Sequence, residues 1–166
     1  MAVDPFVMTH TFLAPRDRVW ALYSEPAHVE ASLRGEGVEV LRSAMRFEVG
    51  GTHHYGTRGP GPAELWGLQR YLAIVPRERI ELVQAFSTAE GGVAPHPMAP
   101  TWPREMTAVT VFEDTADGHT RVTVSWEPRE ADDAAVATFD AARAGMTQGF
   151  ASLFAKLDAY LATLPA

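Results

Sequence analysis

The chain has 166 residues, of which 46% are hydrophobic and 21% are charged, and this balance is typical of a globular protein with one domain. It carries 14 Lys and Arg residues against 21 Asp and Glu residues, a net charge of −7, and no basic cluster, which argues against a nucleic-acid partner. The absence of cysteine excludes disulfides, thiolate metal sites and a thiol nucleophile.

The N-terminal part is predicted to form a strand followed by two short helices. Residues 6–13 alternate in the manner of a strand. Pro15 suits the first turn of a helix, and Pro26 starts a second short helix that runs to about Leu33. Gly35 follows as a helix-ending residue. This bent pair of helices is expected to cover one end of a sheet.

The central part alternates between strand-like segments and turns rich in Gly and Pro. Strands are predicted over residues 38–49, 52–58, 63–74, 79–87, 106–113 and 120–127. Each break suits a hairpin, so consecutive strands are expected to be antiparallel neighbours. In the last strand Val122, Val124 and Trp126 alternate with polar residues, which predicts a sheet with one dry face. Residues 89–103, with four Pro, are expected to form an ordered loop at the mouth of the sheet.

Residues 131–164 are predicted to form one long helix that covers the dry face. Apolar side chains recur there every three or four residues, namely Phe139, Met146, Phe150, Leu153, Leu157, Leu161 and Leu164. Such a helix would span about 50 Å. Gly145 and Gly149 each lower helix stability by about 1 kcal/mol relative to Ala. They are therefore expected to allow close contact with the sheet, which is the commoner use, or to leave cavity space.

This order of elements resembles the helix-grip fold of the START and birch-pollen-allergen (SRPBCC) superfamily. The chain is similar to its bacterial branch, which is related to the C-terminal domain of the activator of the heat-shock-protein-90 ATPase. The matching segments are residues 14–16 with 19–20, 50–51, 76–79, 96–103, 118–122, 139–140 and 146–150. The resemblance implies an α+β fold over residues 1–166, with a curved antiparallel sheet of about six or seven strands around the C-terminal helix.

Two positions depart from the family's pattern. The family often has Trp in the second helix, where this chain has Val29 to Leu33, and it often has Trp where this chain has Phe150. Both positions are expected near a pocket. The cavity here is therefore expected to be wider, or shaped for a different ligand.

The resemblance implies a cavity for a hydrophobic or aromatic small molecule between the sheet and the terminal helix. Residues suited to line it are Tyr55, Trp66, Phe86, Met106, Trp126, Met146 and Phe150. The same residues would also fill a solid core, and the sequence leaves both interpretations open. In the Pro-rich loop, His96 is the first histidine to test and Trp102 is a candidate lid residue, although both would also serve to hold the loop against the core.

No metal site and no cofactor is expected. His53 and His54 are neighbours on a predicted strand, so their side chains point to opposite faces and do not chelate one ion. A single histidine in the cavity could act as a general base or bind a ligand polar group. The sequence contains no phosphate-binding loop and no Gly-x-Ser-x-Gly motif, so catalytic residues are left unassigned.

We predict a carrier, sensor or sequestering protein for a hydrophobic small molecule. One alternative is an enzyme of the cyclase, aromatase or hydrolase type that uses the same cavity, against which stands the lack of a clustered acid and base. Another is a chaperone-associated interaction domain, which ranks last because the additional N-terminal domain of such activators is missing from the sequence. A homodimer is compatible with the sequence.

A cytoplasmic location is expected. No apolar run approaches the ~18 residues of a membrane span. The first residues lack the basic and apolar regions of a secretory signal peptide.

Overall fold

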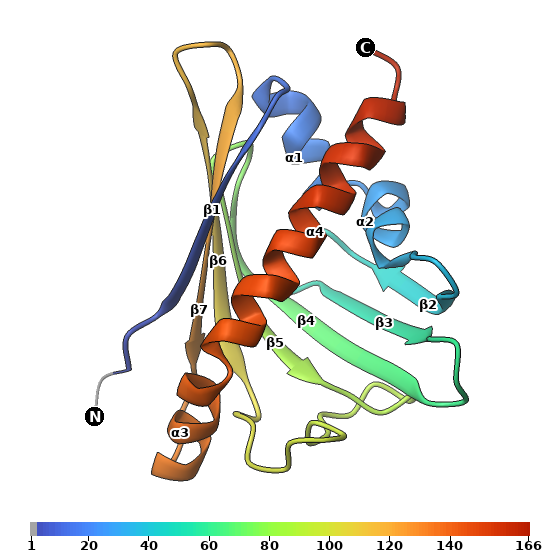
Figure 1. Ribbon diagram of the computed structural model, residues 1–166, viewed down its shortest axis with the longest axis vertical. Helices are drawn as coiled ribbons and strands as arrows, with labels where there is room; N and C mark the ends of the chain where they lie inside the picture. Colours follow the sequence, from blue (N-terminus) through green and yellow to red (C-terminus); the bar gives the residue numbers. More distant parts are fainter. Residues whose placement is uncertain (1–2) are drawn as a thin grey trace.

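The computed structural model describes residues 3–166 and shows an antiparallel sheet that curves around a long C-terminal helix (Figure 1). The strands are β1 (Phe6–Phe12), β2 (Glu39–Met45), β3 (Thr52–Arg58), β4 (Glu64–Val75), β5 (Arg79–Phe86), β6 (Met106–Asp114) and β7 (Thr120–Pro128). The helices are α1 (Arg16–Ser24), α2 (Pro26–Leu33), α3 (Asp133–Ala141) and α4 (Arg143–Thr163). The predicted α+β helix-grip fold is confirmed.

The sheet has seven strands in the order β1-β7-β6-β5-β4-β3-β2. Strands β2 to β7 follow one another as antiparallel neighbours, as the hairpin breaks predicted. Strand β1 returns to the other edge and pairs with β7, from Phe6 opposite Trp126 to Phe12 opposite Thr120. Strands β5 and β2 are shorter than predicted. β5 ends one residue early, at Phe86, and β2 ends at Met45, before the chain turns through Gly50, whose φ is +82°.

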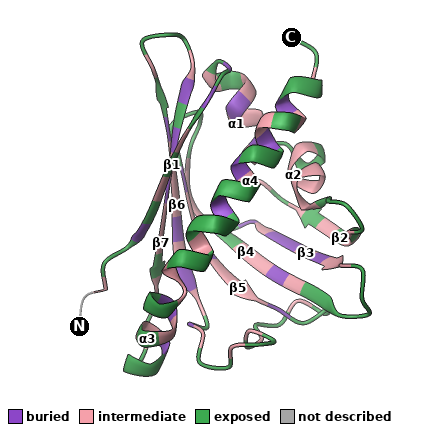
Figure 2. Cartoon of the chain, viewed as in Figure 1, coloured by how far each residue is buried: buried purple, intermediate pink, exposed green. Residues whose placement is uncertain are grey.

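The core lies between the sheet and α4. Four α4 side chains are buried, namely Phe150, Phe154, Leu157 and Leu161. Figure 2 shows buried and exposed positions alternating along this helix. The Phe150 ring lies 5.8 Å from that of Phe6 and 4.8 Å from that of Trp126. The apolar face of α4 therefore fixes the helix against β1 and β7. No helix within residues 3–166 is long and apolar enough to cross a membrane.

The prediction of one uninterrupted helix over residues 131–164 is wrong. Two helices, α3 and α4, meet at Ala142, whose N–H donates to the carbonyls of both Thr138 and Phe139. The Asp132 carboxylate accepts a hydrogen bond from the Ala135 N–H at 2.8 Å and so caps α3. The apolar spacing runs through the break, so periodicity alone gave no sign of it.

The two glycines of α4 do not touch the sheet. A Cβ added at Gly145 or at Gly149 would meet no atom within 4 Å, apart from the helix's own nearby backbone. Close contact with the sheet is therefore not the reason for either glycine.

The C-terminal half of α4 is held by polar contacts from three elements. Arg18 of α1 donates to three carbonyls at the end of the helix, those of Leu161, Leu164 and Pro165. On β1, His10 Nε2 lies 2.9 Å from Asp158 Oδ2. On α2, His28 Nδ1 lies 2.6 Å from the Tyr160 hydroxyl. This half of α4 is thereby tied to the rest of the fold.

Candidate functional site

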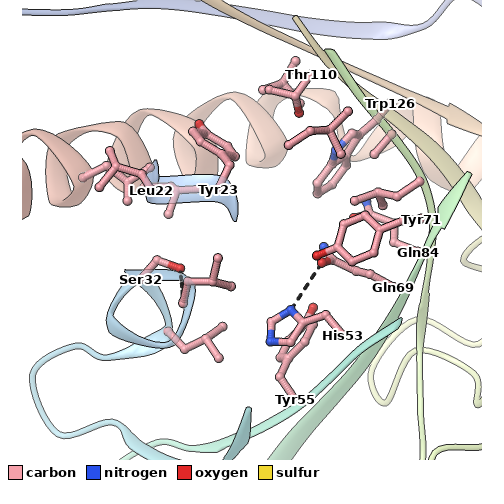
Figure 3. Close-up of a pocket in the computed structure, with 18 of the residues that line it drawn as sticks. Leu22, Tyr23, Ser32, His53, Tyr55, Gln69, Tyr71, Gln84, Thr110 and Trp126 are labelled. Carbon is pink, nitrogen blue, oxygen red and sulfur yellow. Dashed lines mark hydrogen bonds between the residues drawn. The ribbon is translucent and has the colours of Figure 1, made fainter. Parts of the chain in front are cut away.

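A cavity of about 210 Å³ lies between the sheet and α4, next to the two short helices (Figure 3). A second cavity of about 220 Å³ adjoins it on the side of the loop between β5 and β6. Four residues border both lobes: Tyr55, Gln69, Gln84 and Trp126. Together the lobes fall in the lower part of the roughly 300–1,000 Å³ range of small-molecule pockets. The interior is therefore not a solid core.

The first lobe has a mostly apolar wall made by helices and a mixed wall made by strands, in which polar side chains lie beside apolar ones such as Ile80, Leu82 and Val124. The helices contribute Leu22 of α1, Val29 and Leu33 of α2, and Phe150, Leu153 and Leu157 of α4. In Figure 3, Leu22, Tyr23 and Ser32 face His53 and Gln69 across the open space. The two positions that depart from the family's pattern, the second helix and Phe150, thus both border the cavity.

A row of polar side chains crosses three strands on the cavity side of the sheet. His53 of β3 is directly opposite Gln69 of β4, which is directly opposite Gln84 of β5. The His53 Nδ1 lies 3.4 Å from the Gln69 Oε1, and its Nε2 lies 3.0 Å from the Ser43 hydroxyl of β2. Because a carbonyl oxygen only accepts, Nδ1 carries the proton and Nε2 accepts the hydroxyl proton of Ser43.

These polar groups are uncharged at neutral pH. His53 is only 2% exposed, and this burial lowers its pKa. The hydrogen bond with Gln69 acts in the opposite direction but does not outweigh the burial. Burial likewise raises the pKa of Tyr55 and that of Tyr71, so both phenols keep their protons. The polar groups of the strand wall are therefore neutral.

Tyr55 is positioned by a glycine on the next strand. It pairs with Gly67 of β4, and a Cβ added there would lie 2.3 Å from the Tyr55 Cζ. The ring therefore lies across the bare backbone of Gly67, on the cavity side of the sheet.

Trp66 does not line the cavity, contrary to the predicted lining. It precedes Gly67 by one residue, and neighbouring residues on a strand point to opposite faces. Its ring lies across Gly56, where an added Cβ would be 2.5 Å away, and stacks on His54 at 5.3 Å. The outer face of the sheet thus holds Trp66 and His54, while His53 and Tyr55 face inward.

The other predicted site residues gather around the second lobe and an adjoining groove. Phe86, Trp102, Met106 and Trp126 line the second lobe. Met146 and Phe150 border an apolar groove of about 190 Å³ beside α4, together with Trp126, Gly149 and Leu153. The groove shares Trp126, Phe150 and Leu153 with the first lobe, so it lies next to the cavity.

His96 lies behind this lining. Its ring is 4.5 Å from that of Phe86 and 5.9 Å from that of Trp102. Its Nδ1 accepts hydrogen bonds from the N–H groups of Met98 and Ala99. His96 therefore orders the loop that carries Trp102, and a direct role in ligand binding stays a prediction.

The residues missed by sequence reasoning are the polar and aliphatic ones. Aromatic and sulfur side chains were sought, whereas much of the strand wall consists of Gln69, Tyr71, Gln84 and Thr110. The sequence of β4 did indicate them, because Gln69 and Tyr71 follow Gly67 at every second position and therefore lie on the same face of the strand. That face is the one on which Gly67 accommodates Tyr55. Among residues 3–166, no three His, Asp or Glu side chains come together to hold a metal ion.

Comparison with solved structures gives the same fold. Protein Ms6760 from Mycobacterium smegmatis is 20% identical with a TM-score of 0.75, and all of each chain is covered. A protein from Staphylococcus epidermidis is 22% identical with a TM-score of 0.74, covering 100% of this chain and 94% of that one. A protein from Arthrobacter aurescens is 23% identical with a TM-score of 0.74, covering 98% of this chain and 87% of that one.

The family comparison covers nearly the whole fold. None of the curated proteins compared with the chain matches it. The family model described as "Activator of Hsp90 ATPase homolog 1-like protein" matches residues 13–162, from the end of β1 to the end of α4. The chain therefore belongs to the family of activator of Hsp90 ATPase homolog 1-like proteins, within the START-like superfamily.

Proposed function

We propose that this protein binds a mostly apolar, ring-containing small molecule in the cavity beneath α4 and acts as a carrier, sensor or sequestering protein. The observation that supports this is the two-lobed cavity, with a mostly apolar helix wall opposite a strand wall that carries both apolar and polar side chains. Ligand rings would pack against Trp126 and Phe150, whose own rings lie 4.8 Å apart. Ligand polar atoms would meet the strand wall.

The cavity offers enough apolar surface for useful affinity. A two-ring ligand that buries about 200 Å² of apolar surface gains roughly 5 kcal/mol at ~25 cal/mol per Å². Loss of translational and rotational freedom offsets part of this gain. Hydrogen bonds to the strand wall would then supply orientation more than affinity.

Native mass spectrometry of protein purified from its own host tests the proposal, because a retained small molecule would appear as added mass. Titration with a library of apolar metabolites, followed by tryptophan fluorescence, is the second test. Quenching is expected to fall in Trp126→Phe, with Trp102 of the second lobe still contributing, and to be kept in full in Trp66→Phe, since Trp66 lies on the outer face. If no retained molecule is found and no library member quenches fluorescence or shifts Tm, the proposal is wrong.

A second candidate is hydrolysis or proton transfer in the same cavity. Ser43, His53 and Gln69 form a hydrogen-bonded chain in the order of nucleophile, base and orienting group. We rank it second because Ser43 does not border either lobe among the described residues. Hydrolysis of p-nitrophenyl esters is expected to fall to the uncatalysed rate in Ser43→Ala and in His53→Gln. Unchanged turnover would exclude this chemistry.

The chaperone-associated alternative rests on the family's name alone. It predicts that a pull-down with the cognate Hsp90-type chaperone recovers this chain. A pull-down that recovers nothing would exclude this alternative.

A further inference from the structure

The lining of the cavity carries no formal charge. Among the described residues, neither lobe is bordered by an Asp, Glu, Lys or Arg side chain. Ion pairs of the sheet lie elsewhere, as in the pairs of Arg58 with Glu39 and Glu64 near the open edge. The titratable groups in the lining are His53 and three tyrosines, Tyr23, Tyr55 and Tyr71, and burial favours the neutral form of each.

The same lining is rich in hydrogen-bonding groups without a protein partner. Within residues 3–166, the Tyr23 hydroxyl is buried without a hydrogen-bond partner. The hydroxyls of Tyr55 and Tyr71 and the amide of Gln84 also make no hydrogen bond to another protein group among these residues. The Gln69 oxygen accepts from His53, which leaves its NH2 group to donate. A pure hydrocarbon in this space would leave such groups unpaired, at a cost of about 1–3 kcal/mol each.

A charged ligand is disfavoured for a different reason. A carboxylate, phosphate or ammonium group would lose its hydration here and would find no opposite charge on the walls, which costs several kcal/mol. The lining thus disfavours both a pure hydrocarbon and a charged ligand.

We infer that the cavity selects an uncharged ligand with an apolar ring system and one edge that both donates and accepts hydrogen bonds, as a carboxamide, lactam or phenol does. Gln84 supplies a donor and an acceptor in one plane, and the tyrosine hydroxyls supply either. This inference rests on the proposed function, because it specifies the ligand class of the same cavity.

Three probes that share one ring system test the inference: 2-naphthamide, 2-naphthoate and naphthalene. Binding is measured by tryptophan quenching or calorimetry on the full chain near pH 7.5. The amide is expected to bind at least about 30-fold more tightly than the carboxylate and about tenfold more tightly than the hydrocarbon, which corresponds to one or two unpaired polar groups.

Variants of Gln84 locate the effect. Gln84→Leu keeps the approximate shape of the side chain and is expected to remove most of the preference for naphthamide over naphthalene. Gln84→Lys is expected to bring binding of naphthoate, because it supplies a counter-charge. Gln148→Leu on the exposed face of α4 is the matched control and is expected to leave all three affinities unchanged.

The outcomes separate this inference from the proposed function. Equal affinity of wild-type protein for naphthamide and naphthoate, or for naphthamide and naphthalene, overturns the inference and leaves a small-molecule cavity in place. Binding of none of the three probes also overturns the inference, and the proposed function is then decided separately by native mass spectrometry and the metabolite library. The comparison among probes needs only the wild-type protein, so it holds even if a Gln84 variant fails to fold.

Discussion

At the residue scale, two aromatic rings owe their opposite positions to two glycines in one strand pair. Tyr55 lies across Gly67 on the cavity side, and Trp66 lies across Gly56 on the outer side. Each ring covers a backbone position that has no side chain of its own, which is a known way to stabilise glycine within a sheet. The pair therefore offers a matched test of the two faces.

Gly67→Ala and Gly56→Ala are both expected to lower the free energy of unfolding by about 1–3 kcal/mol, because each added methyl displaces a packed ring. Only Gly67→Ala is expected to weaken ligand binding, since it pushes Tyr55 away from the cavity wall. Urea unfolding measures the first effect and probe titration the second. Equal loss of binding in the two variants would contradict the assignment of faces.

His53 predicts a pH dependence of stability. Burial lowers its pKa in the folded protein, while in an unfolded chain the value is about 6.5. Below about pH 6.5 the unfolded chain binds a proton that the folded protein rejects, so the free energy of unfolding decreases as pH falls, by at most about 1.4 kcal/mol per pH unit. The contribution of His53 to the free energy of unfolding is thus fully present above about pH 6.5 and is lost as the pH falls below that value.

His53→Gln serves as the comparison, because other titrating groups contribute equally to both proteins. Wild-type protein is expected to lose more stability than this variant between about pH 7.5 and about pH 5.5. Urea unfolding at the two pH values gives the measurement. Parallel losses in both proteins would show that His53 is not held neutral by the fold.

At the scale of elements, α4 has two glycines that make no close contact with the sheet. Because an added Cβ meets no other atom within 4 Å at either position, alanine there adds helix propensity without a clash. Gly145→Ala and Gly149→Ala are each expected to raise the free energy of unfolding, by up to about 1 kcal/mol. A decrease in either variant, measured by urea unfolding, would contradict this account.

Gly149 differs from Gly145 in bordering the apolar groove beside Trp126. A methyl group at residue 149 narrows that groove, whereas one at residue 145 does not. If ligands enter by the groove, Gly149→Ala is expected to slow the association rate of naphthamide, and Gly145→Ala is the matched control. Stopped-flow fluorescence separates this rate from affinity, and identical rates in both variants exclude the groove as the entry route.

Sequence patterns predicted most elements because each depends on local signals. The hairpin breaks and the alternation in β7 gave the antiparallel meander, and Pro26 marked the start of α2. The break at Ala142 was missed, since neither Gly nor Pro stands there and the apolar spacing continues on both sides. Strand ends such as that of β2 depend on the turn that follows, which local propensity describes poorly.

At the scale of the whole molecule, ligand binding and stability are linked. A ligand that binds only the folded protein adds RT ln(1 + [L]/Kd) to the free energy of unfolding, about 2.7 kcal/mol at a hundredfold excess over Kd. Naphthamide is therefore expected to raise Tm by several degrees, with little effect from naphthoate. Differential scanning fluorimetry checks both, and an equal rise with the two probes would argue for binding outside the neutral cavity.

How much of the site was predictable depends on strand register. Trp126, Phe86 and Met106 were predicted in the lining because rings and thioethers suit contact with a hydrophobic ligand, and all three border the second lobe. The neutral row of His53, Gln69 and Gln84 was not predicted, because it exists only once three strands align in one register. Trp66 was misplaced for the same reason, since a shift of one residue exchanges the faces of a strand.

The pairing of β1 with β7 has a kinetic consequence. Phe6 and Phe12 find their partners Trp126 and Thr120 only after most of the chain has been synthesised. Loop closure over so many residues makes this pairing a slow step. The nascent chain therefore exposes an unpaired N-terminal strand until the last strand emerges, and binding of that strand by a ribosome-associated chaperone would protect it from aggregation.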